Sequence, residues 1–248
     1  MLMETPVQPM DAGSSAPLCV AITGASGALG QALLRVWHRR GARLIALTSS
    51  SEPVLVRDSQ AQLIPLQQVC WQVGQEEELV PVLADVDVLV LNHGVNVYGQ
   101  RDQAATALSL EVNALSSWRL LELFGELASG RPAEQIRPEV WVNTSEAEIE
   151  PAFSPLYEIS KRLMGQLLSL RALDLGQTVR IRRLVLGPFR SALNPVGVMG
   201  PDFVADQILL QAGLGLNLII VTPNPLVYVL MPLTTLGRWL YFRLLTRA

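Results

Sequence analysis

Short apolar runs alternate along the chain with longer segments in which apolar residues recur at helical spacing. Apolar runs predict strands at 18–23, 43–48, 69–73, 86–92, 139–144, 179–186 and 218–221. Helical spacing predicts helices at 30–39, 79–83, 104–124, 155–173 and 203–211. Because the strands are continuous apolar runs rather than alternating ones, both faces of their sheet are expected to be covered. The pattern therefore predicts an α/β fold with a doubly wound parallel sheet, in a single domain.

Composition adds few constraints beyond this pattern. Half of the 248 residues are apolar and 17% are charged, which suits one large domain over 18–248. Residues 1–17 are rich in proline, serine and glycine, so we expect a flexible tail, and they lack the basic start and apolar run of a signal peptide. The net charge of −3 and the absence of a basic patch interleaved with aromatic residues argue against a nucleic-acid partner.

Cysteine and histidine usage predicts a cytoplasmic protein without a metal site. Cys19 and Cys70 both lie in apolar surroundings, which predicts two buried free thiols in a reducing compartment. His38 and His93 are the only histidines, and no CxxC or HExxH motif is present.

A glycine-rich turn, Thr23-Gly24-Ala25-Ser26-Gly27-Ala28-Leu29-Gly30, joins the first predicted strand to the first helix. Glycines here let the backbone turn sharply and approach a pyrophosphate, which the free N–H groups of a helix N-terminus then bind. We expect cofactor contacts from this turn at Gly24, Ser26, Gly27, Leu29 and Gly30. The alternative is a tight structural turn with no ligand.

The end of the second strand, Leu47-Thr48-Ser49-Ser50-Ser51, favours NADP(H) over NAD(H). It carries no carboxylate to repel a 2′-phosphate, while the hydroxyls of Thr48 and Ser49 could donate to one. Possible cationic neighbours are Arg39, Arg40 and Arg57. The alternative is that these hydroxyls only cap and turn the loop.

Tyr157 and Lys161 form a candidate proton-transfer pair. Their spacing of four residues places phenol and ammonium on one face of a predicted helix, one turn apart. A phenol has an ordinary pKa of about 10, and a nearby cation would lower it toward working pH. Tyr157 would then serve as an acid or base. A solvated helix face is the alternative interpretation of this spacing alone.

Asn92-His93-Gly94 at the end of the fourth strand, Asn113 and Ser145 join the glycine turn and the Tyr–Lys pair in order and spacing. Over residues 18–222 the chain thereby resembles the short-chain dehydrogenase/reductase family, which has a Rossmann fold. The resemblance implies a catalytic tetrad of Asn113, Ser145, Tyr157 and Lys161. It also implies cofactor contacts at Asn92, Gly94, Tyr157, Lys161, Gly187 and Ser191.

The chain departs from the family pattern at several positions. The glycine turn is spaced G-x-x-G-x-x-G instead of T-G-x-x-x-G-x-G, Leu186 replaces a proline, and Trp71-Gln72 stands where an aspartate often contacts adenine. Ser145 precedes Tyr157 by twelve residues where thirteen is commoner, which leaves Thr144 as the fallback.

Each site residue also has a structural interpretation. Asn113 could be a helix-kink residue, Ser145 could cap a strand end, and His93 could be a packed loop residue. The acidic residues Glu146, Glu148 and Glu150 are expected in a solvated loop.

The resemblance implies an NADP(H)-dependent oxidoreductase that interconverts a carbonyl and an alcohol by hydride transfer. Tyr157 would exchange the proton, Lys161 would lower the pKa of Tyr157 and hold the nicotinamide ribose, and Ser145 would bind the substrate oxygen. The apolar loop at 189–201 suits a small apolar substrate. The alternative is a non-catalytic NADP-binding regulator or scaffold with the same fold.

The C-terminal segment 232–248 predicts a short apolar helix that begins at Pro232. Three interpretations compete: packing on its own domain or across a dimer interface, a peripheral contact with a membrane, and a frayed tail. The resemblance implies a homo-oligomer.

Overall fold

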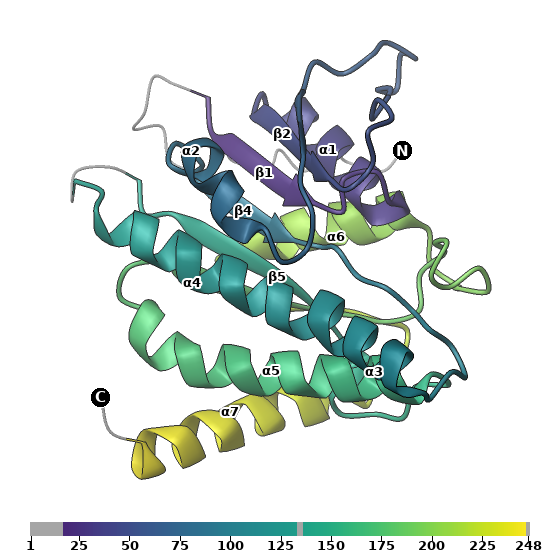
Figure 1. The fold of residues 1–248 in the computed structure, drawn as a ribbon, viewed down its shortest axis with the longest axis vertical. Coiled ribbons are helices and arrows are strands. Elements are labelled where there is room, and N and C mark those ends of the chain that lie inside the picture. The colour runs from purple at the N-terminus through teal and green to yellow at the C-terminus, as the bar shows by residue number, and fades with distance from the viewer. Residues whose placement is uncertain (1–16, 133–135, 247–248) are drawn as a thin grey trace, which may run out of the picture.

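The computed structural model describes residues 17–132 and 136–246, and the predicted tail at 1–17 lies almost wholly outside them. Within the described residues, seven parallel strands form one sheet in the order β3-β2-β1-β4-β5-β6-β7 (Figure 1). The strands are β1 (Cys19–Thr23), β2 (Arg43–Thr48), β3 (Gln67–Cys70), β4 (Val88–Leu91), β5 (Glu139–Ser145), β6 (Arg180–Leu186) and β7 (Leu218–Val221).

The α-helices are α1 (Ala28–Arg39), α2 (Val80–Leu83), α3 (Gln103–Leu110), α4 (Ser116–Ser129), α5 (Pro155–Leu175), α6 (Pro201–Gly213) and α7 (Val227–Leu245). Short turns of helix are η1 (Glu76–Leu79), η2 (Glu111–Leu115) and η3 (Glu146–Glu148). This architecture confirms the predicted doubly wound α/β fold.

Successive side chains of each strand point to opposite faces of the sheet and pack into two apolar layers. Val20 and Ile22 of β1 pack with α1 and α6 on one face of the sheet. Cys19 and Ala21 of the same strand pack with α2, α4 and α5 on the other. Since both faces are covered, the central strands are buried throughout, as their continuous apolar runs predict.

Three predicted elements differ from the structure. The third strand spans 67–70 instead of 69–73, and the helix predicted at 104–124 is divided into α3, the π-helical turn η2 and α4. The C-terminal helix begins at Val227 rather than at Pro232, so Pro232 lies inside α7 and leaves the Tyr228 carbonyl without its helical N–H donor. Cys70, predicted to be buried, is exposed, since it ends the edge strand β3.

The helix α7 runs beside α5 along the lower side of the molecule (Figure 1). Its 19 residues correspond to roughly 28 Å of helix. Among the described residues, no helix is both long and apolar enough to cross a membrane.

Candidate active site

The glycine turn has the shape of an anion cradle. Gly24 adopts a φ of +61°, and a Cβ there would lie 2.9 Å from His93 Cα. A Cβ at Gly30 would lie 2.3 Å from the Gly24 carbonyl oxygen, so neither position has room for a side chain. Gly27 is the N-cap of α1, and no side chain caps this helix end. The N–H groups of its first turn therefore suit the pyrophosphate of a dinucleotide.

The end of β2, where the adenosine ribose of a dinucleotide is expected, carries hydroxyl groups. The three arginines named from the sequence bind other groups of the protein. Thr48 is buried and accepts a hydrogen bond from the Ser50 N–H at 3.1 Å, so it turns the loop. Ser26 and Ser49 are exposed. The arginines contact other groups of the protein: Arg39 pairs with Asp206, Arg40 donates to Leu209 O, and Arg57 donates to Ala61 O. Within the described residues, the exposed hydroxyls of Ser26 and Ser49 donate no hydrogen bond, so a 2′-phosphate could accept from them without breaking a contact of the protein.

Ser145, Tyr157 and Lys161 meet at the carboxyl edge of the sheet. Ser145 ends β5, and its hydroxyl lies close enough to Tyr157, in the first turn of α5, to influence the pKa of that phenol. The Ser145 Oγ also accepts from the Ala147 N–H at 3.2 Å and donates to Leu186 O at 3.4 Å, so it caps the turn that follows β5. Lys161, one turn further along α5, places its Nζ 5.6 Å from the centre of the Tyr157 ring. The Nζ also donates to Asn143 O at 3.0 Å.

Thr144, the fallback for Ser145, occupies a different position. Its side chain is buried and donates to Leu184 O inside the sheet at 3.2 Å. Successive residues of a strand point to opposite faces, so only one of the two hydroxyls can meet Tyr157. In this structure it is the hydroxyl of Ser145.

Burial dominates the protonation of the Tyr–Lys pair. It raises the pKa of Tyr157, and the nearby Ser145 hydroxyl opposes this rise. It lowers the pKa of Lys161 to about 8, an effect that the Glu148 carboxylate opposes. The expected lowering of the Tyr157 pKa is therefore not seen, because desolvation disfavours the charged forms of both groups. The pair therefore holds a neutral phenol beside an amine whose pKa is about 8.

Asn113 lies in the π-helical turn η2 and clamps the loop that follows β4. Its Oδ1 accepts from the Val95 N–H at 2.8 Å, and its Nδ2 donates to Val95 O at 2.9 Å. The same Nδ2 donates to Ser160 Oγ at 3.0 Å, next to Lys161 on α5. A Cβ at Gly94 would lie 3.1 Å from Asn113 Oδ1. Asn113 thus lies where the helix is irregular, as its structural interpretation expected. It also fixes the position of the loop after β4 and of α5 next to Lys161.

Asn92 and His93 tie β4 to the glycine turn. The Asn92 N–H donates to Thr23 Oγ1 at 2.8 Å, and Asn92 Oδ1 accepts from Asn143 Nδ2 at 2.8 Å. The His93 Nδ1 lies 2.8 Å from the same Thr23 hydroxyl, and the ring packs edge-on against Trp71. Burial, with a smaller effect of the Lys161 cation, lowers the pKa of His93 to about 4. This histidine is neutral at physiological pH and packs as a loop residue.

Gly187 and Ser191 follow β6. A Cβ at Gly187 would lie 2.4 Å from Thr222 Oγ1, so this glycine permits close packing against the end of β7. The Ser191 Oγ accepts from the Asn194 N–H at 3.2 Å and closes a turn.

Three loops at this edge are hydrogen-bonded to one another through residues that sequence reasoning missed. Tyr98 Oη donates to Ala192 O at 3.2 Å, and Asn96 Nδ2 donates to Leu193 O at 3.3 Å. Ser154 Oγ donates to Asn96 Oδ1 at 2.6 Å. No local pattern marks these residues, because each bond joins loops far apart in sequence.

The acidic stretch after β5 is not a solvated loop, contrary to the sequence expectation. Glu148 is 2% exposed and accepts from Arg183 at 3.0 Å and from Arg238 at 2.5 Å. Glu146 accepts from Thr222, and burial raises the pKa of its carboxyl. Glu150 accepts from Asn224 Nδ2 at 2.6 Å. All three carboxylates therefore hold neighbouring segments in place.

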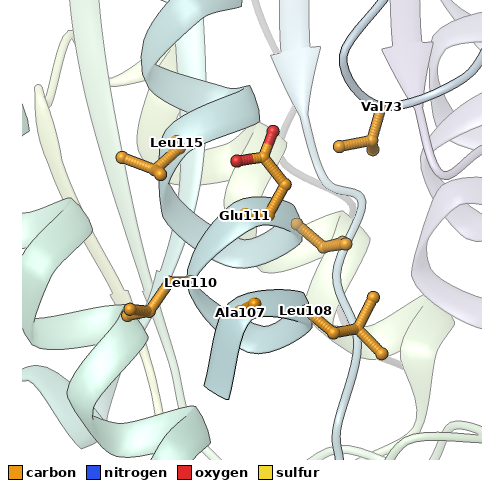
Figure 2. A pocket seen from close by; sticks show the side chains of 7 residues that line it. Val73, Ala107, Leu108, Leu110, Glu111 and Leu115 are labelled. Carbon is orange, nitrogen blue, oxygen red and sulfur yellow. The ribbon is translucent and has the colours of Figure 1, made fainter. Parts of the chain in front are cut away.

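A separate apolar depression lies beside α3 and η2. Figure 2 shows Leu108 and Val73 on one side of it and Leu110 and Leu115 on the other, with the Glu111 carboxylate between them. None of the predicted site residues lines this depression. It is therefore distinct from the cluster around Tyr157.

Comparison with known proteins is consistent with this site. A family model described as "NAD dependent epimerase/dehydratase family" matches residues 20–137. The curated "Monoglucosyldiacylglycerol epimerase" of Synechocystis sp. is 47% identical over 229 residues, which are 92% of this chain and 55% of that protein. The chain thus spans about half the length of this relative.

Solved structures share the fold at low sequence identity. A "bulky-bulky ketone specific alcohol dehydrogenase" from Comamonas testosteroni superposes with a TM-score of 0.75 at 17% identity, covering 92% of this chain and 94% of its own. A short-chain dehydrogenase from Sphingobium yanoikuyae in complex with NADPH gives a TM-score of 0.74 at 17% identity, with 93% and 97% covered. Together, the matches to the family model, to the curated relative and to these folds support a family of the short-chain dehydrogenase/reductase type for this chain.

Proposed function

We propose that this protein is an epimerase of a glycolipid headgroup, which oxidises one sugar alcohol to a ketone and reduces it again on the opposite face. The observation that carries the proposal is that Tyr157 and Lys161 lie together at the end of β5, where Lys161 is bonded to Asn143. Asn143 is in turn linked through Asn92 to the start of the glycine turn. The substrate class comes from the relative, whose name specifies a glucosyl diacylglycerol. Alcohol–ketone interconversion is the shared half-reaction of such an epimerase and of a dehydrogenase.

The residues of this chain would divide the work as follows. When bound, a nicotinamide dinucleotide supplies the acceptor and donor of the hydrogen on the substrate carbon. Tyr157 would take the hydroxyl proton during oxidation and return it during reduction. Lys161, whose Nζ lies 5.6 Å from the centre of the Tyr157 ring, would hold the nicotinamide ribose beside that phenol. Ser145 would donate to the substrate oxygen where negative charge develops.

The glycine turn would hold the pyrophosphate through the N–H groups at the start of α1. The exposed hydroxyls of Ser26 and Ser49 support NADP(H), as the missing acid at the end of β2 does.

A second candidate is an NADP(H)-dependent reductase that releases an alcohol from a small apolar ketone. Exposed apolar side chains in the loop after β6 favour it, since Val196 is 87% exposed and Val198 is 64% exposed. The two functions differ in net chemistry. An epimerase regenerates its cofactor in every cycle, whereas a reductase consumes NADPH.

The test uses monoglucosyldiacylglycerol dispersed in detergent with NAD or NADP. We expect the glucosyl headgroup to be converted into its epimer while it stays attached to the lipid. The absorbance of the reduced nicotinamide should show no net change. Tyr157→Phe should lower turnover by at least about 100-fold while cofactor binding persists. Tyr241→Phe, at an exposed tyrosine of α7, is the matched control and should retain full turnover.

Net consumption of NADPH with a ketone, and no epimer, would favour the reductase. If neither substrate class reacts although the cofactor binds, both enzymatic proposals fail, and the chain is a non-catalytic binder of the cofactor.

A further inference from the structure

The helix α7 presents its apolar side to the outside. Leu233, Leu236, Leu240 and Leu244 form a stripe at spacings of three and four residues and are 60%, 60%, 49% and 72% exposed. The polar residues Thr234, Thr235 and Arg238 are only partly exposed. A surface helix of a water-soluble protein has the opposite arrangement, with its apolar stripe facing the core.

This outward orientation is held by specific contacts. Val227 and Met231 are buried in a small apolar cluster with Val185 and Ile220 of the sheet. Further along the helix, Arg238 donates to the buried carboxylate of Glu148. The helix is therefore fixed at its start by Val227 and Met231 and further along by Arg238. Rotating α7 so that the leucines face the core would break the ion pair between Arg238 and Glu148.

The charge and aromatic content of α7 match a lipid headgroup region. The helix sequence contains no acidic residue, and its cations are Arg238 and Arg243. The Arg243 guanidinium lies 5.3 Å from the centre of the Trp239 ring. Arginine beside tryptophan, next to a leucine stripe, is typical of helices that lie in a membrane interface. Because Arg238 is paired with Glu148, the exposed cation of this surface is Arg243, and it favours anionic lipids.

The start of α7 lies next to the loop that follows β5. Thr222 donates to Glu146, and Asn224 donates to Glu150, so the segment before α7 is bonded to the loop after β5. The same loop carries Phe153, whose side chain is fully exposed. Figure 1 shows α7 extending from this end of the molecule along the outer side of α5, the helix that bears Tyr157.

We propose that the outward face of α7 docks on the surface of a lipid bilayer and thereby brings the loop after β5 to the membrane. The docking surface consists of Leu233, Leu236, Leu240, Leu244 and Arg243. A substrate linked to diacylglycerol would then reach Tyr157 without leaving the membrane interface. This identity of the substrate rests on the proposed function.

Sedimentation with vesicles tests the docking. The full chain is mixed with vesicles of phosphatidylcholine alone or with added phosphatidylglycerol, and we expect co-sedimentation that is stronger with the anionic lipid. The double variant Leu236→Gln with Leu240→Gln should partition about 100-fold more weakly, at roughly tenfold for each leucine side chain withdrawn from lipid. Glutamine keeps helix propensity close to that of leucine.

The matched control is Leu55→Gln with Leu63→Gln, which are 66% and 53% exposed in the segment between β2 and β3, at the opposite edge of the sheet. This variant should bind vesicles as the parent does. Equal binding by the two double variants, or no binding by the parent chain, would overturn the docking proposal. So would a stable dimer of the parent that the α7 variant loses, because a second copy would then cover the stripe.

Failure of docking and failure of the proposed function are distinguishable. Turnover of detergent-dispersed glycolipid tests the function without vesicles, and the α7 double variant should retain it. Vesicle binding without any turnover would leave the docking intact and reject the epimerase, whereas turnover without vesicle binding would do the reverse.

Discussion

Acid sensitivity of folding should depend on His93. The residue is partly exposed as a whole, but its Nε2 is buried and has no hydrogen-bond partner in the described part of the chain. Its Nδ1 lies 2.8 Å from Thr23 Oγ1, and the Trp71 ring packs edge-on against the imidazole. Protonation would place a cation on a buried nitrogen near Lys161, so the folded protein keeps the ring neutral down to a pKa of about 4.

The magnitude follows from linkage. In the unfolded chain His93 binds a proton below a pKa of about 6.5, whereas in the folded chain it does so only below about 4. Between these values the unfolded state binds more protons, so stability falls as the pH is lowered through this window. From pH 7 to pH 5 the expected loss from this residue is roughly 2 kcal/mol.

Urea unfolding followed by tryptophan fluorescence at pH 7 and pH 5 measures this loss. The parent chain should lose roughly 2 kcal/mol more than His93→Gln over this interval. His38→Gln, at the other histidine, should behave as the parent. If His93→Gln shows the same pH dependence as the parent, the buried neutral histidine is not the cause and the argument fails.

Two further predictions concern stability. Glu148→Gln leaves the guanidinium groups of Arg183 and Arg238 without their shared carboxylate and should cost about 3–5 kcal/mol of unfolding free energy in urea. Asp206→Asn, which breaks the exposed pair with Arg39, should cost less than about 1 kcal/mol, and equal losses would contradict this assignment. Gly187→Ala forces a Cβ to 2.4 Å from Thr222 Oγ1 and should destabilise the protein by about 1–3 kcal/mol in thermal unfolding. Gly237→Ala, whose Cβ would meet nothing within 4 Å, should be neutral or stabilising, and a similar loss from both alanines would contradict the steric argument.

The sequence by itself determined the features that depend on short-range spacing. Continuous apolar runs predicted the buried parallel strands, and the glycine turn between the first strand and helix predicted a cradle with no room for side chains. The four-residue spacing of Tyr157 and Lys161 predicted that both lie on one face of a helix. These features follow from the fixed geometry of strands, turns and helices, which the local sequence is enough to specify.

Only the tertiary structure decided which groups meet across the fold. It placed Ser145, rather than Thr144, on the side of β5 that faces Tyr157, because neighbouring strand residues face opposite sides of the sheet. It also buried Glu148 between two arginines and set the pKa directions of the Tyr–Lys pair. Such outcomes depend on side chains that are remote in sequence and on the desolvation that packing imposes, and neither is encoded in local spacing.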